Sequence, residues 1–159
     1  MATREGLIAS LRADQQFWRN LVAEVGPDRL TTPGPMGEWT FGDMAGHLLG
    51  WRNRTIRRLE AAGRGEGEPP EAWPAELDDD DRINDWIREE HADRTATDLV
   101  ADYDASYDRL IAALEALPED KLTDAAAFPW VGDALVNVDF TGHLQEEHVP
   151  SVRAWLDAA

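Results

Sequence analysis

Apolar side chains recur every three or four residues over most of this chain, and this period constrains its fold more than any other feature. The first such segment holds seven apolar residues at helical spacing: Leu7, Ile8, Leu11, Trp18, Leu21, Val22 and Val25. Thr3 is the expected N-cap of this helix, and Gly26-Pro27 ends it. No stretch of useful length alternates with a period of two, so the pattern predicts helices and gives no signal for strands.

A second long helix is expected after a loop rich in proline and glycine at residues 31–38. Thr40 has the residue type of an N-cap, and Asp43 stands three positions later, a spacing close to a capping box. Gly63 ends this helix, and the prolines and glycines of residues 63–77 predict a loop. Its apolar face contains Phe41, Met44, Ala45, Leu48, Ile56 and Leu59.

The second half of the chain predicts one short helix and two long ones. The acidic run Asp78–Asp81 suits a helix N-terminus, because carboxylates there satisfy free N–H groups and the helix dipole. Thr97 is expected to cap a third long helix that Pro118 closes, and a last helix is expected from about Ala134 to Leu156. The sequence therefore predicts an all-α four-helix bundle, in a single domain over residues 1–159, with a long crossover between the second and third long helices and a short extra helix.

Charge narrows the range of partners. The 159 residues include 32 Asp and Glu against 15 Lys and Arg, a formal net charge of −17. Because phosphate binding and attraction to anionic membranes both rest on Lys and Arg, this charge predicts no nucleic-acid partner and no membrane partner. There is no run of about 18 apolar residues that could span a bilayer, and the first twelve residues lack the apolar core of a signal peptide. We expect a cytoplasmic protein with a small-molecule substrate.

The chemistry must come from histidines and carboxylates. The chain has no cysteine, which removes disulfides, thiolate metal sites and a thiol nucleophile of its own. Three of its four histidines, His47, His143 and His148, fall on the second and the last long helices. Side chains from facing helices of a bundle commonly build metal sites, and two imidazoles completed by a carboxylate or a third imidazole suit an open, catalytic type of centre.

Glu147 and His148 are the two candidates for the third metal ligand. His143 and Glu147 are one turn apart on a regular helix, whereas His143 and His148 are about 140° apart, which normally prevents shared coordination. Pro150 cannot donate a hydrogen bond to the carbonyl of Glu146, and a kink or π-bulge there turns His148 toward His143. The third ligand is therefore Glu147 in a regular helix and His148 in a bulged one.

Each histidine taken alone has a simpler interpretation as a hydrogen-bonded core residue. His148 falls within the apolar arc of its helix, and His91, at the end of the short helix, fits a structural position near the helix C-terminus.

Three tryptophans and a basic cluster are candidates for a pocket. Trp73 and Trp130 are outside the apolar stripes of the helices. They either pack their loops against the bundle or, together with Trp51, line an apolar pocket over His47. The arginines at 52, 54, 57 and 58 fit a solvated face that pairs with the excess acid, and Arg54, two turns from His47, is the one placed to face an anionic substrate. Our candidates for the pocket lining are Trp51, Arg54 and Trp130.

Several short motifs resemble the DinB-like (YfiT-type) superfamily of four-helix bundles. The residues that carry the resemblance are Trp39-Thr40-Phe41-Gly42-Asp43, Gly46-His47-Leu48 and, in the last helix, His143 to His148 with Trp155-Leu156. Within the superfamily, the ClbS/DfsB branch is the most similar, through Gly46-His47, Arg82-Ile83-Asn84 and Phe128-Pro129-Trp130.

The resemblance implies a bundle, often dimeric, with a pocket at one end. Many members hold a divalent metal such as zinc or nickel through one histidine of the second helix and a His-x-x-x-His of the last. His47 and His143 match these positions, whereas Glu147 occupies the place of the second histidine and His148 comes one residue late. Relatives include metal-dependent hydrolases and transferases or isomerases that use a low-molecular-weight thiol, such as mycothiol or bacillithiol.

The preferred hypothesis is a small-molecule enzyme, either a metal-dependent hydrolase or a thiol-dependent transferase or isomerase. Since the chain lacks cysteine, any thiol must be a cofactor. The alternative, implied by the ClbS/DfsB branch, is a metal-free binding or resistance protein that acts on an electrophilic small molecule.

Overall fold

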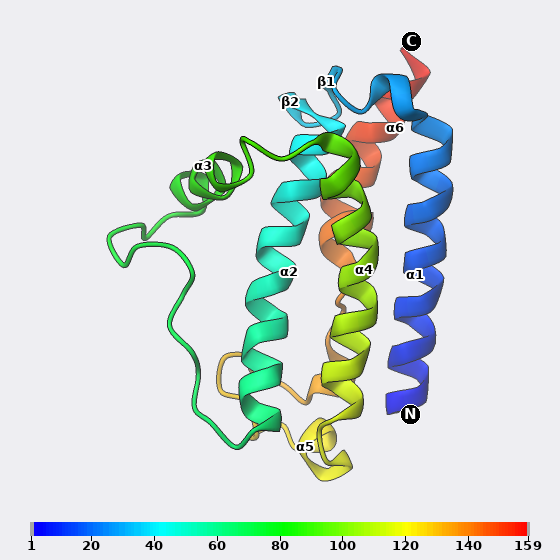
Figure 1. The fold of residues 1–159 in the computed structure, drawn as a ribbon. Coiled ribbons are helices and arrows are strands. Elements are labelled where there is room, and N and C mark those ends of the chain that lie inside the picture. The colour runs from blue at the N-terminus through cyan, green and yellow to red at the C-terminus, as the bar shows by residue number, and fades with distance from the viewer. Residues whose placement is uncertain (1, 159) are drawn as a thin grey trace.

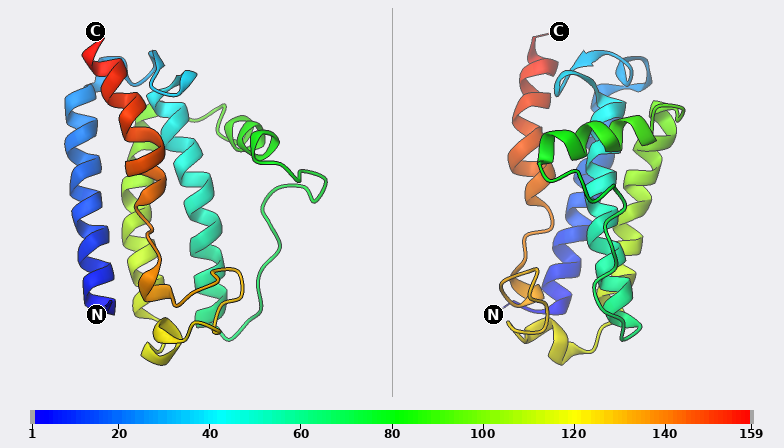
Figure 2. Two further views of the ribbon diagram at one scale, coloured as in Figure 1. Left: turned by 180° about the vertical axis from the view of Figure 1, so that it is seen from behind. Right: turned by 90° about the vertical axis from the view of Figure 1, so that its left-hand side faces the viewer.

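The computed structural model describes residues 2–158, and four helical stretches lie side by side in it (Figure 1). These are α1 (Arg4–Val25), α2 (Phe41–Gly63), α4 (Ala96–Glu115) and a last stretch in which a π-helix (His143–His148) continues into α6 (Val149–Asp157). The short helix α3 (Asp80–Glu90) lies in the crossover that joins α2 to α4, outside the bundle (Figures 1 and 2). The prediction of an all-α four-helix bundle with a long crossover and an extra short helix is confirmed.

The first two long helices begin where the sequence places their caps. Thr3 accepts a hydrogen bond from the backbone N–H of Gly6 at 3.0 Å. Thr40 and Asp43 form a reciprocal capping box, in which each side chain accepts from the other residue's backbone N–H at 3.0 Å. Because α2 starts at a fixed residue, its histidine and arginine side chains have a fixed register along the bundle.

The predicted cap of the third long helix is wrong by two residues. Thr95, and not Thr97, accepts from the backbone N–H of Asp98 at 3.0 Å, and Thr97 lies inside α4. Thr95 has an acidic residue three positions later in the first turn, whereas the residue three positions after Thr97 is Val100. Thr95 and Asp98 thus have the same Thr-x-x-Asp spacing as Thr40 and Asp43 at the start of α2.

The last helix is shorter than predicted. Residues 134–142 form a 3₁₀ turn (Leu135–Asn137) followed by a loop, and helical structure resumes only at His143. Asp139 explains the break, because its carboxylate accepts hydrogen bonds from the backbone N–H and the hydroxyl of Thr141 at 2.9 and 2.7 Å. Such local side-chain bonds compete with the helical pattern.

Two small elements have no counterpart in the prediction. A hairpin pairs β1 (Pro33–Gly34) with β2 (Gly37–Thr40) just before α2, and α5 (Glu119–Thr123) follows Pro118. Both are too short to show a period in the sequence.

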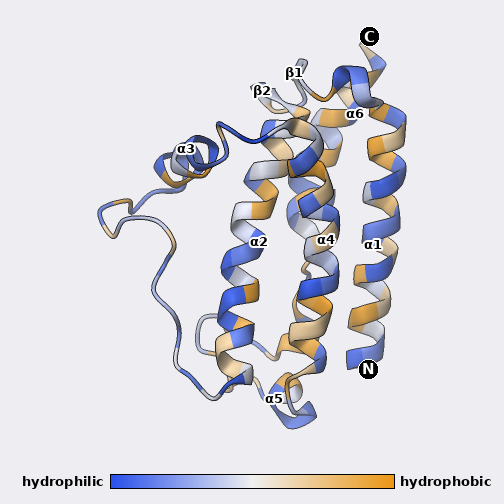
Figure 3. Cartoon of the chain, in the orientation of Figure 1, coloured by the Kyte–Doolittle hydropathy of each residue, from blue (hydrophilic) through white to orange (hydrophobic). Residues whose placement is uncertain are grey.

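The core lies between the long helices, along their apolar stripes (Figure 3). At its centre Trp18 of α1 stacks on Phe41 of α2 at 5.2 Å between ring centroids, and meets Tyr103 of α4 edge-on at 4.7 Å. These contacts fix α1, α2 and α4 together.

A second, smaller apolar cluster attaches the crossover to α2. Its buried members are Trp73, Ile83 and Ile87, with Trp51 against them. Gly50 makes this packing possible, because a Cβ at that position would be 2.6 Å from Ile87 Cγ2. Within residues 2–158, no helix is both long and apolar enough to cross a membrane.

Candidate metal centre

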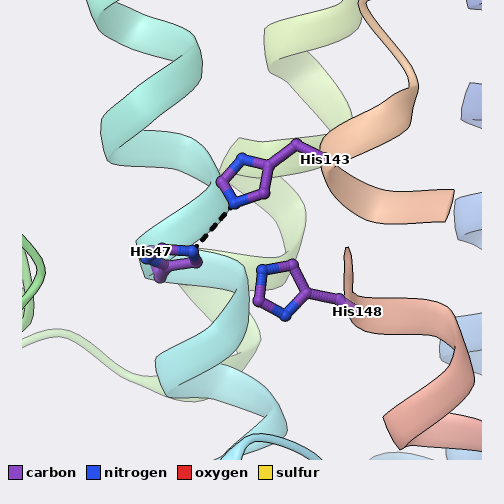
Figure 4. A group of neighbouring side chains, drawn as sticks. All are labelled: His47, His143 and His148. Carbon is purple, nitrogen blue, oxygen red and sulfur yellow. Dashed lines mark hydrogen bonds between the residues drawn. The ribbon is translucent and has the colours of Figure 1, made fainter. Parts of the chain in front are cut away.

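Three imidazoles converge between α2 and the last helical stretch (Figure 4). The Nε2 atoms of His47 and His143 are 3.0 Å apart, and the ring of His148 is 5.0 Å from each of theirs, centroid to centroid. One ring nitrogen from each histidine lies within 4.8 Å of the other two. The candidate ligands that the sequence placed on two separate helices therefore meet in space.

The π-helix is the reason that His148 belongs to this cluster. In a π-helix residue i bonds to residue i+5, so His143 and His148 lie one turn apart rather than on different faces. Pro150 stands in the first turn of α6, where it has no N–H to offer to the regular helical pattern. Glu147, the alternative third ligand, is at the edge of the cluster with its side chain 68% exposed and Oε2 at 3.5 Å from His143 Nε2.

The environment keeps all three imidazoles neutral at pH 7. Burial is the main cause that lowers the pKa of His47 to about 3, and the charges that His143 and His148 can carry are the further causes. Burial also lowers the pKa of His143 to about 4, with the charge of Arg52 as the second cause. For His148, burial and then His143 lower the pKa to about 4, against the opposing charge of Glu147. Neutral imidazole is the form that binds a metal.

The residues present fit a divalent metal. Zinc–imidazole bonds of about 2.0–2.1 Å put two ligand nitrogens of one tetrahedral ion roughly 3.3 Å apart. The 3.0 Å between the Nε2 atoms of His47 and His143 is close to this value. Three neutral imidazoles suit zinc or nickel, and a site with three protein ligands leaves an open position. One feature departs from common metal sites, since the Nδ1 atom of His47 is buried without a hydrogen-bond partner.

A cavity of about 650 Å³ opens onto the cluster. All three histidines lie in its wall, as do Trp51, Arg54 and Trp130, the three residues expected at a pocket. Trp73 lies outside this lining and instead packs in the small apolar cluster of the crossover, with its ring 5.2 Å from that of Trp51.

Three of the four arginines in the basic cluster are half-buried and bind oxygen atoms of the crossover. Arg54 binds the carboxylate of Glu71 through Nε at 2.8 and 2.9 Å. Arg58 bonds to the same carboxylate at 3.0 Å, and Arg57 donates to the carbonyl of Pro70 at 3.1 Å.

Arg52 differs from its neighbours in a way that was not predicted from the sequence. Its side chain is buried, and its guanidinium lies over the rings of Tyr103 and Tyr107 at 4.5 and 4.1 Å. A signal was available, because Leu48, Arg52 and Ile56 are four residues apart and so share the apolar face of α2.

His91 has no part in the cluster. It is the C-cap of α3, and burial, followed by the charge of Arg94, lowers its pKa.

Comparison with known protein families shows the family of this chain. The model of the mycothiol maleylpyruvate isomerase N-terminal domain matches residues 11–149. The chain belongs to this family. The match covers most of the bundle, including all three clustered histidines, and it confirms the DinB-like resemblance. A comparison with curated proteins found no match.

A solved structure supports the fold independently. The chain is similar to the colibactin self-resistance protein ClbS, crystallised in complex with a dsDNA, with a TM-score of 0.65. The two share 15% sequence identity over 92% of this chain and 95% of that one. At this identity the likeness shows a common fold.

The ClbS complex also corrects one prediction. The net charge of −17 was expected to exclude nucleic acid, yet a protein of this fold is found with a dsDNA, so the exclusion was wrong. Net charge is a sum over the whole surface, whereas phosphates contact a local patch. The sum therefore does not decide which macromolecules can approach one face.

Proposed function

We propose that this chain is a small-molecule enzyme in which His47, His143 and His148 hold a divalent metal, zinc or nickel, at the wall of the cavity. The observation that carries the proposal is the convergence of three neutral imidazoles from two helices on one side of that cavity. Membership of the mycothiol maleylpyruvate isomerase N-terminal domain family supports a reaction on a small molecule.

In this proposal the histidines bind the metal and the tryptophans of the cavity bind the substrate. A divalent metal, when bound, would lower the pKa of a coordinated water or thiol and so supply a nucleophile near pH 7. The three imidazoles, which line the cavity, would hold the ion, and a site with three protein ligands would leave a coordination position for a ligand. Trp51 and Trp130 give that cavity apolar walls, which bind the carbon skeleton of a substrate and exclude water.

Two reaction types fit this arrangement, hydrolysis and thiol-dependent transfer or isomerisation. The chain has no cysteine, so the second type needs a free thiol as cofactor. The family description names mycothiol, which makes it the first thiol to test.

A second candidate function does without the metal. The aromatic part of the cavity wall, formed by Trp51, Trp130 and Phe140, suits an apolar electrophile, and the similar ClbS is a self-resistance protein. In this version the protein binds or opens a reactive small molecule, and the histidines serve only as polar groups in the wall.

One experiment separates these versions. The protein is stripped on a chelating resin, reloaded with zinc or nickel, and incubated with aryl esters and epoxides, with and without mycothiol. We expect turnover only after reloading, and its loss in His47→Gln but not in His91→Gln, which removes the histidine outside the cluster. Consumption of mycothiol identifies the transferase, and thiol-independent turnover the hydrolase. Equal turnover in stripped protein contradicts the metal-dependent proposal and favours the metal-free one.

A further inference from the structure

Arg52 is a buried cation on the wall of the same cavity. Its side chain is enclosed between α2, α4 and the loop before the π-helix, and the residue is only 8% exposed. The guanidinium donates to Ser106 Oγ and to the carbonyl of Phe140, both at 3.4 Å. A guanidinium has five N–H donors, so most of its capacity is unused, and the two bonds present are long.

Arg52 also has no anionic partner. Within residues 2–158, no carboxylate lies within 4.0 Å of its guanidinium, although the chain carries 32 acidic residues. Asp14, which is also buried, is engaged elsewhere, because its two oxygens accept hydrogen bonds from Tyr107 and Gln145, each at 2.6 Å. A buried charge without a charged partner is costly, and an anionic ligand in the cavity would supply the missing partner.

The tyrosine rings hold this cation in place. Tyr103 and Tyr107 lie against the guanidinium and are themselves buried, so their faces stabilise the charge while most of its N–H donors remain free. The stacking orients the planar group without occupying further N–H donors.

The charges around the cavity limit which anion can bind. Asp80, Asp139 and Glu147 also line it, and these carboxylates disfavour a ligand with two negative charges. Arg54, the other arginine of the lining, is already paired with Glu71. One free guanidinium therefore matches one carboxylate, which it can bind through two parallel hydrogen bonds.

We propose that Arg52 is the anion-binding group of this cavity and that its ligand is a small organic molecule with a single carboxylate. This assignment rests on the proposed function, in which the cavity is the substrate site. A ligand held at Arg52 has its remaining atoms in the same cavity as the three imidazoles. Binding at Arg52 requires no metal, so it can be measured separately.

The test is a titration of metal-free, ¹⁵N-labelled protein followed by NMR, including the arginine Nε–H signals. Benzoate is the probe, benzamide its neutral counterpart and phenyl phosphate the dianion; the aromatic ring suits the tryptophan walls. We expect saturable binding of benzoate with a shift of the Arg52 Nε–H signal, and affinities for benzamide and phenyl phosphate that are lower by on the order of tenfold or more.

Variants locate the site. Arg52→Gln loses benzoate binding, and Arg52→Lys, which keeps the charge but not the two parallel donors, retains only weak binding. Arg57→Gln removes a charge from the same helix outside the cavity lining and leaves benzoate binding unchanged. If Arg52→Gln does not fold, the relative affinities of the three probes for the unmodified protein still test whether the cavity binds a single carboxylate.

Equal binding of benzoate and benzamide, no binding of either, or tighter binding of phenyl phosphate overturns the assignment. So does benzoate binding that is unchanged in a folded Arg52→Gln variant. None of these results bears on metal binding, so the inference can fail while the proposed function stands.

Discussion

The imidazoles of His47 and His143, 96 residues apart in the chain, face each other through their Nε2 atoms at 3.0 Å. In the metal-free protein one of these nitrogens must carry a proton and the other must accept it, since two lone pairs at this distance repel. A divalent metal would take the place of that proton, and the distance between the two nitrogens is already close to the roughly 3.3 Å that two ligands of one tetrahedral ion need. The relationship therefore describes a site that is largely formed before a metal arrives.

Removal of His148 should weaken metal binding far more than removal of Glu147. The π-helix turns His148 into the cluster, whereas Glu147 is mostly exposed at its edge. We expect His148→Ala to lower zinc affinity by more than about 100-fold, since loss of an outer-shell partner alone costs 10–100-fold, and Glu147→Ala to lower it by far less. Competition with a chromophoric chelator measures both. A larger loss of zinc affinity in Glu147→Ala than in His148→Ala would indicate that the carboxylate of Glu147 is the third ligand.

Acid should destabilise the metal-free protein through these histidines. Their pKa values fall from 6.5 in the unfolded chain to about 3 for His47 and about 4 for His143 and His148. At a pH between the folded and the unfolded pKa values, the unfolded state binds more protons than the folded state. The free energy of unfolding therefore falls as the pH drops below about 6.5. Urea midpoints measured between about pH 7 and pH 5 should decrease, and less steeply in His148→Gln than in the unmodified protein. A midpoint that is constant over this range contradicts the burial of neutral imidazoles.

The start of α4 can be tested with two neighbouring threonines. Thr95 makes the capping bond and Thr97 does not, although both are exposed. Thr95→Ala should cost about 1 kcal/mol of the free energy of unfolding. Thr97→Ala should change it by less than about 0.5 kcal/mol, because alanine is the better helix former inside α4. Chemical denaturation of the two variants checks this, and the reverse order places the cap at Thr97.

Gly50 should be the glycine that holds the crossover against α2. A Cβ there would lie 2.6 Å from Ile87, whereas a Cβ at Gly63, near the end of the same helix, meets nothing within 4 Å. Gly50→Ala should destabilise the protein by about 1–3 kcal/mol through overpacking. Gly63→Ala should be neutral or slightly stabilising. Denaturant midpoints give both numbers, and similar values for the two variants contradict the close packing of α3 on α2.

The parts of the fold that repeat over many residues could be predicted from the sequence. Apolar spacing and the Thr40–Asp43 pair indicated the helices and the start of α2, and Pro150 indicated a possible bulge. The break before His143 could not be predicted, because it depends on one local side-chain turn at Asp139 that competes with helix formation. The hairpin at residues 33–40 was missed because it is too short to show a period.

The candidate site was predictable in its residues but not in its electrostatics. The histidines stand out because the chain has no cysteine and four histidines. The pairing of each arginine depends on the crossover, whose Glu71 takes Arg54 and Arg58 and leaves Arg52 to the tyrosines of α4. No pattern in a single sequence states where such a crossover lies. The net charge failed as a guide to partners for a related reason, since it carries no information on local patches.

Metal content is the most direct test of the central claim. Protein purified without an affinity tag is analysed by mass spectrometry for zinc and nickel, beside His47→Gln and the matched His91→Gln variant. The three-imidazole site predicts close to one divalent ion per chain in the unmodified protein and in His91→Gln, and a loss of that ion in His47→Gln. Absence of a stoichiometric ion from the unmodified protein, even after incubation with zinc or nickel, contradicts it.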